Sequence, residues 1–361
     1  MGREAAELRY LELKNVLCEK IYEGVYQSGE RIPSERQLAE EYGMSRITVR
    51  KALELLEEDD LIVREVGNGT KVTLKNYGNR NPLDVIALVA PSKNPFFVRF
   101  IAEFQKCAWE HDTLLLYVEV PEPTSLEDCL YRLYRKDIRN VVVWPDDQSI
   151  DREKLLRLRS IGMNLVFFDT DVAHPFADSV FLDNEDAVET LLRAGDTFVD
   201  YMYVGWDNLY VSNIRKREEA YRRIHPEGKV ENVPWRRDRR IEREALERIN
   251  ELAETMEHGL ILCGAGEIGM QVLEFLADQN EFDSSGKQSK VTLAVIDEFE
   301  GAKKYSFLLY NQDLQASAEK IFECLKCQME EGAKWKAKIC PVKGQFKACL
   351  LYTSDAADDL I

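Results

Sequence analysis

The chain has 361 residues, which is enough for two or three domains that each bury their own core. Its formal net charge of -17 excludes a protein that coats nucleic acid through bulk positive charge. No apolar run of about 18 residues occurs, and the first residues lack an apolar signal core, so we expect a cytoplasmic protein without a membrane segment.

Residues 33–50 predict two short helices joined by a tight turn. Leu38 contributes to an apolar side of the first helix, and Gly43 supplies a permissive turn position. Ser45 is a good N-cap for a second helix that runs toward Leu56. This is the outline of a helix-turn-helix element that reads DNA.

The second helix begins with the hydrogen-bond donors Arg46, Thr48 and Arg50. Because the first residues of a recognition helix approach the major groove most closely, these side chains are placed to reach base edges and phosphates. A solvated amphipathic helix pair is the alternative interpretation.

A predicted hairpin follows at once, with two short β-runs around the turn at 67–69. A helix pair followed by a hairpin is a winged helix. Residues 11–73 resemble the DNA-binding domain of the GntR family of bacterial transcription regulators. The matching motifs are P-S-E-R at 33–36, S-R-I-T-V-R at 45–50 and G-N-G-T at 67–70.

The resemblance implies a set of DNA-contacting residues, in which the glycine lets the wing tip approach the minor groove. The set is Arg36, Ser45, Arg46, Thr48, Arg50 and Gly69. The family often has a hydroxyl where this chain has Ile47, which leaves the base preference at that position open.

A polar stretch with Gly and Pro follows Lys75 and lacks apolar periodicity. Such composition is typical of a linker. We therefore assign residues 1–76 to a DNA-binding domain and residues 77–83 to a linker.

Beyond the linker, short apolar strands alternate with helices, as at 84–90 and 292–297. This alternation predicts parallel sheets covered on both faces. The strands are more numerous than one doubly wound sheet usually holds, so we expect two lobes within residues 84–345. Two such lobes are the design of a hinge-closing receptor, since ligands bind outside the carboxyl ends of the strands.

Residues 84–345 resemble the effector domain of LacI-type repressors, which is similar to periplasmic sugar-binding proteins. The matching segments are V-I-A-L-V-A-P-S-K-N-P-F-F (85–97), F-F-D (167–169), V-F-L-D-N-E-D-A (180–187), R-E-E-A-Y-R-R (217–223), V-T-L-A-V-I-D-E (291–298) and Y-N-Q-D-L (310–314). The combination looks like the arabinose-repressor branch of the GntR family. The predicted fold is an N-terminal winged helix-turn-helix domain (α+β) followed by a two-lobed α/β domain like that of periplasmic binding proteins.

The second resemblance implies a ligand cleft whose residues come from both lobes. They are Asn94, Phe96, Phe97, Asp169, Asn184, Arg217, Asp297 and Gln312. Aromatic rings stack on the C–H face of a sugar, while amide, carboxylate and guanidinium groups hydrogen-bond its hydroxyls. Core packing is the alternative for the two phenylalanines, and a helix cap is the alternative for Asp169.

Two positions depart from the LacI-type pattern. Thr170 stands where an arginine commonly follows the strand-end aspartate, and Ala265-Gly266 stands where Asn-Asp is usual. These changes remove a cation and two hydrogen-bonding side chains. The effector class therefore stays open between a carbohydrate-like molecule and a sugar phosphate.

Gly264, Gly266 and Gly269 have G-x-G-x-x-G spacing between a strand and a helix. The spacing fits a dinucleotide site, close packing of helix on strand, or backbone N–H groups that bind a phosphate. Against a dinucleotide, the acidic residue Asp297 comes about 30 residues later rather than about 20. A cytosolic NAD(P)-dependent α/β enzyme with a regulatory winged helix is the alternative function.

The sequence offers no pairing of a nucleophile with a base. The four histidines fall in different segments, so we expect no enzyme and no cofactor. Cys324, Cys327, Cys340 and Cys349 could form a four-thiolate zinc set. The first pair lies in a helical apolar pattern, however, so we expect buried thiols and no metal.

Residues 349–361 break the pattern after an expected final strand at 338–342. They resemble translated sequencing-adapter read-through, and we assign them no function. The rest predicts a repressor that binds a palindromic double-stranded DNA operator as a homodimer and responds to a small sugar or sugar derivative.

Overall fold

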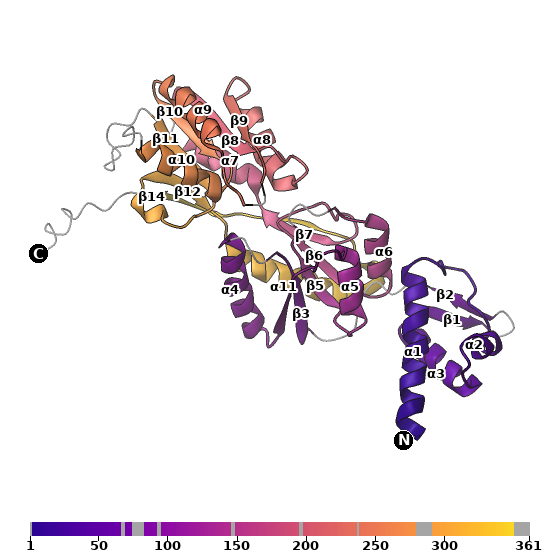
Figure 1. The fold of residues 1–361 in the computed structure, drawn as a ribbon. Coiled ribbons are helices and arrows are strands. Elements are labelled where there is room, and N and C mark those ends of the chain that lie inside the picture. The colour runs from indigo at the N-terminus through magenta and orange to yellow at the C-terminus, as the bar shows by residue number, and fades with distance from the viewer. Residues whose placement is uncertain are drawn as a thin grey trace, which may run out of the picture. The chain divides into compact units, whose positions relative to one another are not determined.

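The computed structural model describes residues 2–65, 69–73, 83–91, 95–145, 149–194, 198–236, 238–278 and 291–349 (Figure 1). The chain forms two compact units. The first comprises the described parts of Met1–Ser92, Gln105–Ser179 and Ala318–Ile339, and the second those of Lys93–Phe104, Val180–Ser317 and Cys340–Ile361.

The N-terminal part of the first unit is a winged helix, as predicted. Its elements are α1 (Gly2–Tyr22), α2 (Glu35–Glu41), α3 (Arg46–Glu58), β1 (Ile62–Glu65) and β2 (Gly69–Val72). The two strands pair antiparallel, with Ile62 opposite Val72. One apolar core, which includes Leu17, Leu38 and Leu53, holds the helices to the hairpin.

Most of the first α/β lobe lies in the same unit, and the lobe is built on a six-stranded sheet. Its strands are β3 (Val85–Val89), β4 (Leu114–Val118), β5 (Asn140–Val143), β6 (Asn164–Phe168), β7 (Asp178–Leu182) and β13 (Ile339–Val342), in the order β13-β7-β6-β5-β3-β4. The strands β3, β4, β5 and β6 run parallel. Its helices are α4 (Pro95–Glu110), α5 (Leu126–Tyr134), α6 (Arg152–Ser160) and α11 (Leu314–Glu331).

The second unit contains the other α/β lobe, also with six strands. They are β8 (Asp200–Trp206), β9 (Lys229–Val233), β10 (Gly259–Cys263), β11 (Val291–Ile296), β12 (Phe307–Asn311) and β14 (Gln345–Cys349), in the order β14-β12-β11-β10-β8-β9. Helices α7 (Asn184–Arg193) and α8 (Ser212–Ile224) share one apolar core with the sheet. Helices α9 (Arg243–Glu254) and α10 (Gly266–Asp278) share another, so the sheet is covered on both faces as predicted.

The last strand corrects the predicted end of the domain. Strand β14 pairs antiparallel with β12, and Cys349 lies opposite Phe307. The domain therefore continues past residue 345, and Cys349 belongs to the sheet rather than to the tail. Residues 350–361 lie outside the described part of the chain.

Within the described residues, none of the helices combines the length and the apolar character that crossing a membrane needs.

Candidate functional site

The exposed N-terminal end of α3 forms the candidate DNA-binding face. Ser45 caps this helix, because its Oγ accepts a hydrogen bond from the Thr48 amide at 3.1 Å and lies 2.8 Å from the Thr48 Oγ1. Arg46 is exposed, and Ile47 next to it is 80% exposed. An apolar side chain that the fold leaves so open is available to the methyl group of a thymine.

The other two arginines of this face already have carboxylate partners. Arg50 donates to Glu35 of α2 through Nε at 3.3 Å and Nη2 at 3.2 Å. Arg36 lies 3.6 Å from Glu40 one turn along its own helix. These exposed pairs are weak in water, so a phosphate can compete for either arginine.

Gly69 opens the second strand of the wing with a φ of 82°, a conformation that favours glycine. Among the described residues other than its chain neighbours, no atom lies within 4 Å of the position that a Cβ would take there. The backbone conformation, and not crowding, thus explains the glycine. Residues 66–68, which precede it, lie outside the described residues.

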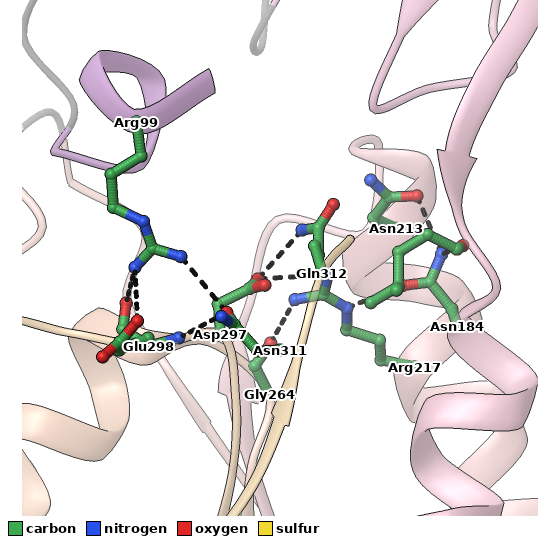
Figure 2. Close-up of polar contacts among 10 residues, drawn as sticks. Arg99, Asn184, Asn213, Arg217, Gly264, Asp297, Glu298, Asn311 and Gln312 are labelled. Atoms are coloured by element: carbon green, nitrogen blue, oxygen red, sulfur yellow. Dashed lines mark hydrogen bonds and ion pairs between the residues drawn. The ribbon is translucent and has the colours of Figure 1, made fainter. Parts of the chain in front are cut away.

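A second candidate site, the effector site, lies at the carboxyl edge of the sheet in the second lobe. Strands β8 to β12 run parallel, so their ends meet at one edge. Gly264 follows β10, Asp297 follows β11 and Gln312 follows β12. The structure brings these three together with Arg217 of α8 and Asn184 of α7 (Figure 2).

Arg217 is the centre of this site and is buried. Its Nε donates to the Asn184 Oδ1 at 2.7 Å, and its Nη1 donates to the Gly264 carbonyl at 2.7 Å. Its Nη2 lies 3.6 Å from the Asp297 Oδ2, which also accepts from the Gln312 Nε2 at 3.1 Å (Figure 2). A buried guanidinium needs such partners because desolvation of an isolated charge is costly.

Two buried acceptors of this site remain unused. The Asp297 Oδ1 and the Gln312 Oε1 accept no hydrogen bond from the described part of the chain. A buried oxygen without a donor is costly, so water or a ligand is expected to supply one. At these two positions the site therefore offers acceptors to a ligand that carries O–H or N–H groups.

Asp297 also has a left-handed backbone, with a φ of 75°, and Asp169 at the end of β6 has a φ of 60°. Only a few per cent of residues other than glycine adopt such angles, and they cluster at functional sites. The predicted aspartates of the two lobes thus share one unusual conformation at equivalent strand ends.

The remaining predicted effector residues have different outcomes. Phe97 of α4 is buried, which fits the core-packing alternative. Asn94 and the side chain of Phe96 lie outside the described residues. Thr170, which follows Asp169, is buried.

Sequence reasoning missed several residues at the same edge. Asn213 accepts from the Asn184 Nδ2 at 2.9 Å and so fixes the amide that Arg217 uses. Arg99, in the part of α4 that belongs to the second unit, donates to the Glu298 carbonyl at 3.1 Å and to the Asn311 Oδ1 at 3.2 Å (Figure 2).

Trp235, just beyond β9, was also missed. Its ring packs edge-on against Trp206 with centroids 5.8 Å apart, and the Arg239 guanidinium lies 3.2 Å over it.

The three glycines of the G-x-G-x-x-G spacing are explained by close packing. A Cβ on Gly264 would lie 2.4 Å from the Tyr203 Oη, and one on Gly269 would lie 2.5 Å from a methyl of Val295. A Cβ on Gly266 would lie 2.8 Å from the Asp297 carbonyl. The geometry favours the packing interpretation over a dinucleotide or phosphate site.

Glu267 in the first turn of α10 is further evidence against a phosphate or dinucleotide site at this helix. Burial raises the pKa of its carboxyl, and the nearby Asp297 raises it further. An anionic ligand here would meet an acidic side chain. Across the described residues, no cluster of three or more side chains suited to a metal ion occurs.

Residues 9–72 match the family described as "Bacterial regulatory proteins, gntR family". Over 77 residues the chain is 39% identical to the probable fructoselysine utilization operon transcriptional repressor of Escherichia coli (strain K12). This match covers 21% of the chain and 32% of that protein, so the chain spans about a third of the length of such curated relatives.

The α/β part is similar to solved structures. One is the Cra transcriptional dual regulator from Pseudomonas putida in complex with fructose 1-phosphate, with a TM-score of 0.59, 13% identity and coverage of 74% of this chain and 100% of that chain. Another is a periplasmic ribose ABC transporter from Conexibacter woesei DSM 14684, with a TM-score of 0.59, 14% identity and coverage of 75% and 94%. At such identities the likeness establishes the fold alone.

Proposed function

We propose that this chain, which joins a GntR-family helix-turn-helix domain to a two-lobed domain of the LacI and periplasmic-binding-protein fold, is a ligand-responsive DNA-binding repressor. The observation that carries the proposal is the pairing of an exposed, capped recognition helix with a buried polar site at a sheet edge. Relatives of the N-terminal domain are named as transcriptional repressors, which supports the same function. Such a repressor works in the cytoplasm, where its operator lies.

The exposed start of α3 supports reading of DNA in the major groove. Arg46 and Ile47 face solvent, and Arg50 is held by one partly exposed carboxylate that a phosphate can replace. We assign Arg36, Arg46, Thr48 and Arg50 to phosphate and base contacts, and Gly69 to the wing.

Dimerisation is proposed through the edge of the first lobe. Strand β4 ends the order of its sheet, and its Leu114 is 68% exposed. Trp109, at the end of α4, is 83% exposed. Exposed apolar groups on an edge strand are typical of an interface, and a second copy on a two-fold axis would present two winged helices to a palindromic operator.

The effector is proposed to be a neutral carbohydrate-like molecule with adjacent hydroxyls. The unused Asp297 Oδ1 and Gln312 Oε1 are acceptors, which match hydroxyl donors. Arg217 is paired with Asp297, and Arg99 at the same edge lies 3.5 Å from a carboxylate oxygen of Glu298, so a phosphate would have to compete with an acidic side chain for either guanidinium. The network therefore favours a polyol over a sugar phosphate.

DNA selection from a random library tests the first part of the proposal. We expect the full chain to enrich palindromic sites, and Leu114→Lys to leave a protein that sediments as a monomer and binds those sites more weakly. Failure to enrich any sequence at low salt would refute the repressor assignment.

Calorimetric titration of the full chain tests the effector class. Neutral pentoses, hexoses and pentitols are compared with the phosphates of the same sugars. We expect saturable binding of a neutral member and weaker binding of its phosphate. Tighter binding of the phosphate would overturn the effector assignment while leaving the DNA assignment intact.

A further inference from the structure

Helix α5 has two buried apolar faces, and the sheet of its own lobe can cover only one of them. Leu126, Leu130 and Leu133 lie at helical spacing on one side and belong to the apolar core. Tyr131 and Tyr134 lie on an adjacent side, and both are buried as well. A nine-residue helix with two buried faces must be covered by two neighbours.

The second neighbour is the winged-helix domain. Tyr22, the last residue of α1, stacks on Tyr131 with ring centroids 4.1 Å apart and planes 3° apart. The Tyr22 hydroxyl donates to the Asp128 Oδ1 at 3.1 Å. Both rings are buried, so this contact excludes water.

Helix α6 completes the contact from the other side. The Lys154 Nζ lies 5.7 Å from the centre of the Tyr22 ring and 2.8 Å from the Asp128 Oδ1. The Arg157 Nη1 donates to the Tyr22 carbonyl at 3.2 Å. A Cβ at Gly24 would lie 3.0 Å from the Arg157 Cζ, so the chain after α1 also lies against α6.

The docked domain keeps its reading end free. Arg46 and Ile47 at the start of α3 are exposed. The recognition helix therefore presents its first turn to solvent while the end of α1 is held against α5 and α6.

Helices α5 and α6 also lead into the edge that carries predicted effector residues. Helix α5 precedes β5, and α6 precedes β6, which ends just before Asp169. We propose that α5 and α6 form a docking surface for the chain's own DNA-binding domain, so that the first lobe carries the recognition helix as a rigid attachment. This docking does not depend on the proposed function.

Hydrogen exchange of the full chain, without DNA or effector, tests the docking. The readouts are the amides of residues 13–22 and of residues 126–134. Tyr22→Ala should speed exchange in 126–134, and Tyr131→Ala should speed it in 13–22, each by about 5–30-fold. Tyr131→Phe keeps the aromatic ring, so the amides of both segments should exchange at the rates of the natural chain.

Two further variants keep the test decisive. Tyr42→Ala removes a winged-helix tyrosine whose hydroxyl accepts a hydrogen bond from the Lys20 Nζ. This variant should leave amide exchange in residues 126–134 unchanged. Lys154→Glu changes a partly exposed side chain beside Asp128, so it should loosen the docking without loss of folding. Unchanged exchange across the contact in Tyr22→Ala and Lys154→Glu would overturn the proposal, whether or not the chain binds DNA.

Discussion

The arginines of the DNA-binding face lie on the surface of the winged helix, whereas Arg217 of the effector site is buried. Arg50 has one carboxylate partner that water also reaches, while Arg217 is bound by an amide, a carbonyl and a carboxylate. An exposed cation can exchange its partner for a phosphate at little cost, but a buried one cannot release its partners without desolvation. The same side chain is therefore available for a new contact in one region and forms part of a fixed network in the other.

Replacing Arg217 should have the largest effect, because it tests whether the fixed network stabilises the lobe. Arg217→Ala leaves the Asp297 carboxylate buried without its cation, which costs about 3–5 kcal/mol. We expect Tm of the second lobe to fall by about 10 °C in calorimetry.

Arg215→Ala on the same helix is the matched control. Arg215 pairs with Glu219 in the open, where such a pair contributes about 0.3–0.5 kcal/mol. Equal Tm values for Arg217→Ala and Arg215→Ala would show that the buried network does not stabilise the lobe.

The DNA-binding domain could be predicted closely from the sequence because its signals are local. The cap at Ser45 and the turn at Gly43 stand within a few residues of the helices they position. The full set of strands could not be predicted in this way. Strands such as β9 and β12 depend on pairing with distant strands, and β14 was assigned partly to the tail.

The residues of the candidate effector site follow from a family resemblance and not from a local sequence pattern. Nothing in the neighbourhood of Arg217 indicates that it meets Gly264 and Asp297, since these contacts form only when the sheet assembles. The unused oxygens of Asp297 and Gln312 appear only in the assembled site. The partner of Arg50 was missed for the same reason, because Glu35 lies on another helix.

The next largest effect is expected from replacing Arg50, which tests whether this side chain contacts DNA. Arg50→Ala should weaken operator binding by about 10–100-fold in fluorescence anisotropy, because a recognition-helix contact is lost. Its exposed position predicts unchanged melting and unchanged effector binding.

Lys106→Ala on α4 removes the same charge far along the chain from the reading helix and serves as the control. If both variants bound the operator equally, net charge and not a specific contact would explain the loss.

Ile47 provides a finer test of how the exposed face reads sequence. A contact between its side chain and a thymine methyl would contribute about 0.8 kcal/mol, or about fourfold in affinity. Replacing single thymines of the operator by uracil should weaken binding of the natural chain at one position in each half-site.

The variant Ile47→Ser should be insensitive to that replacement, because it has no apolar surface to lose. Sensitivity that persists in Ile47→Ser would assign the methyl contact to another residue.

The smallest expected effect on operator affinity comes from replacing Glu35, the carboxylate partner of Arg50. Glu35 holds Arg50 through two hydrogen bonds, and a phosphate must displace it. Glu35→Gln removes the competing charge and should tighten operator binding by about two- to fivefold at low salt, with a smaller gain at higher salt because screening weakens the pair. Weaker binding in Glu35→Gln would instead mean that the carboxylate orients Arg50 toward the DNA, as Asn184 orients Arg217 in the effector site. Arg50 at the surface would then be held in a fixed orientation by its neighbour, as the buried Arg217 is. The two regions would differ only in how strongly the arginine is held.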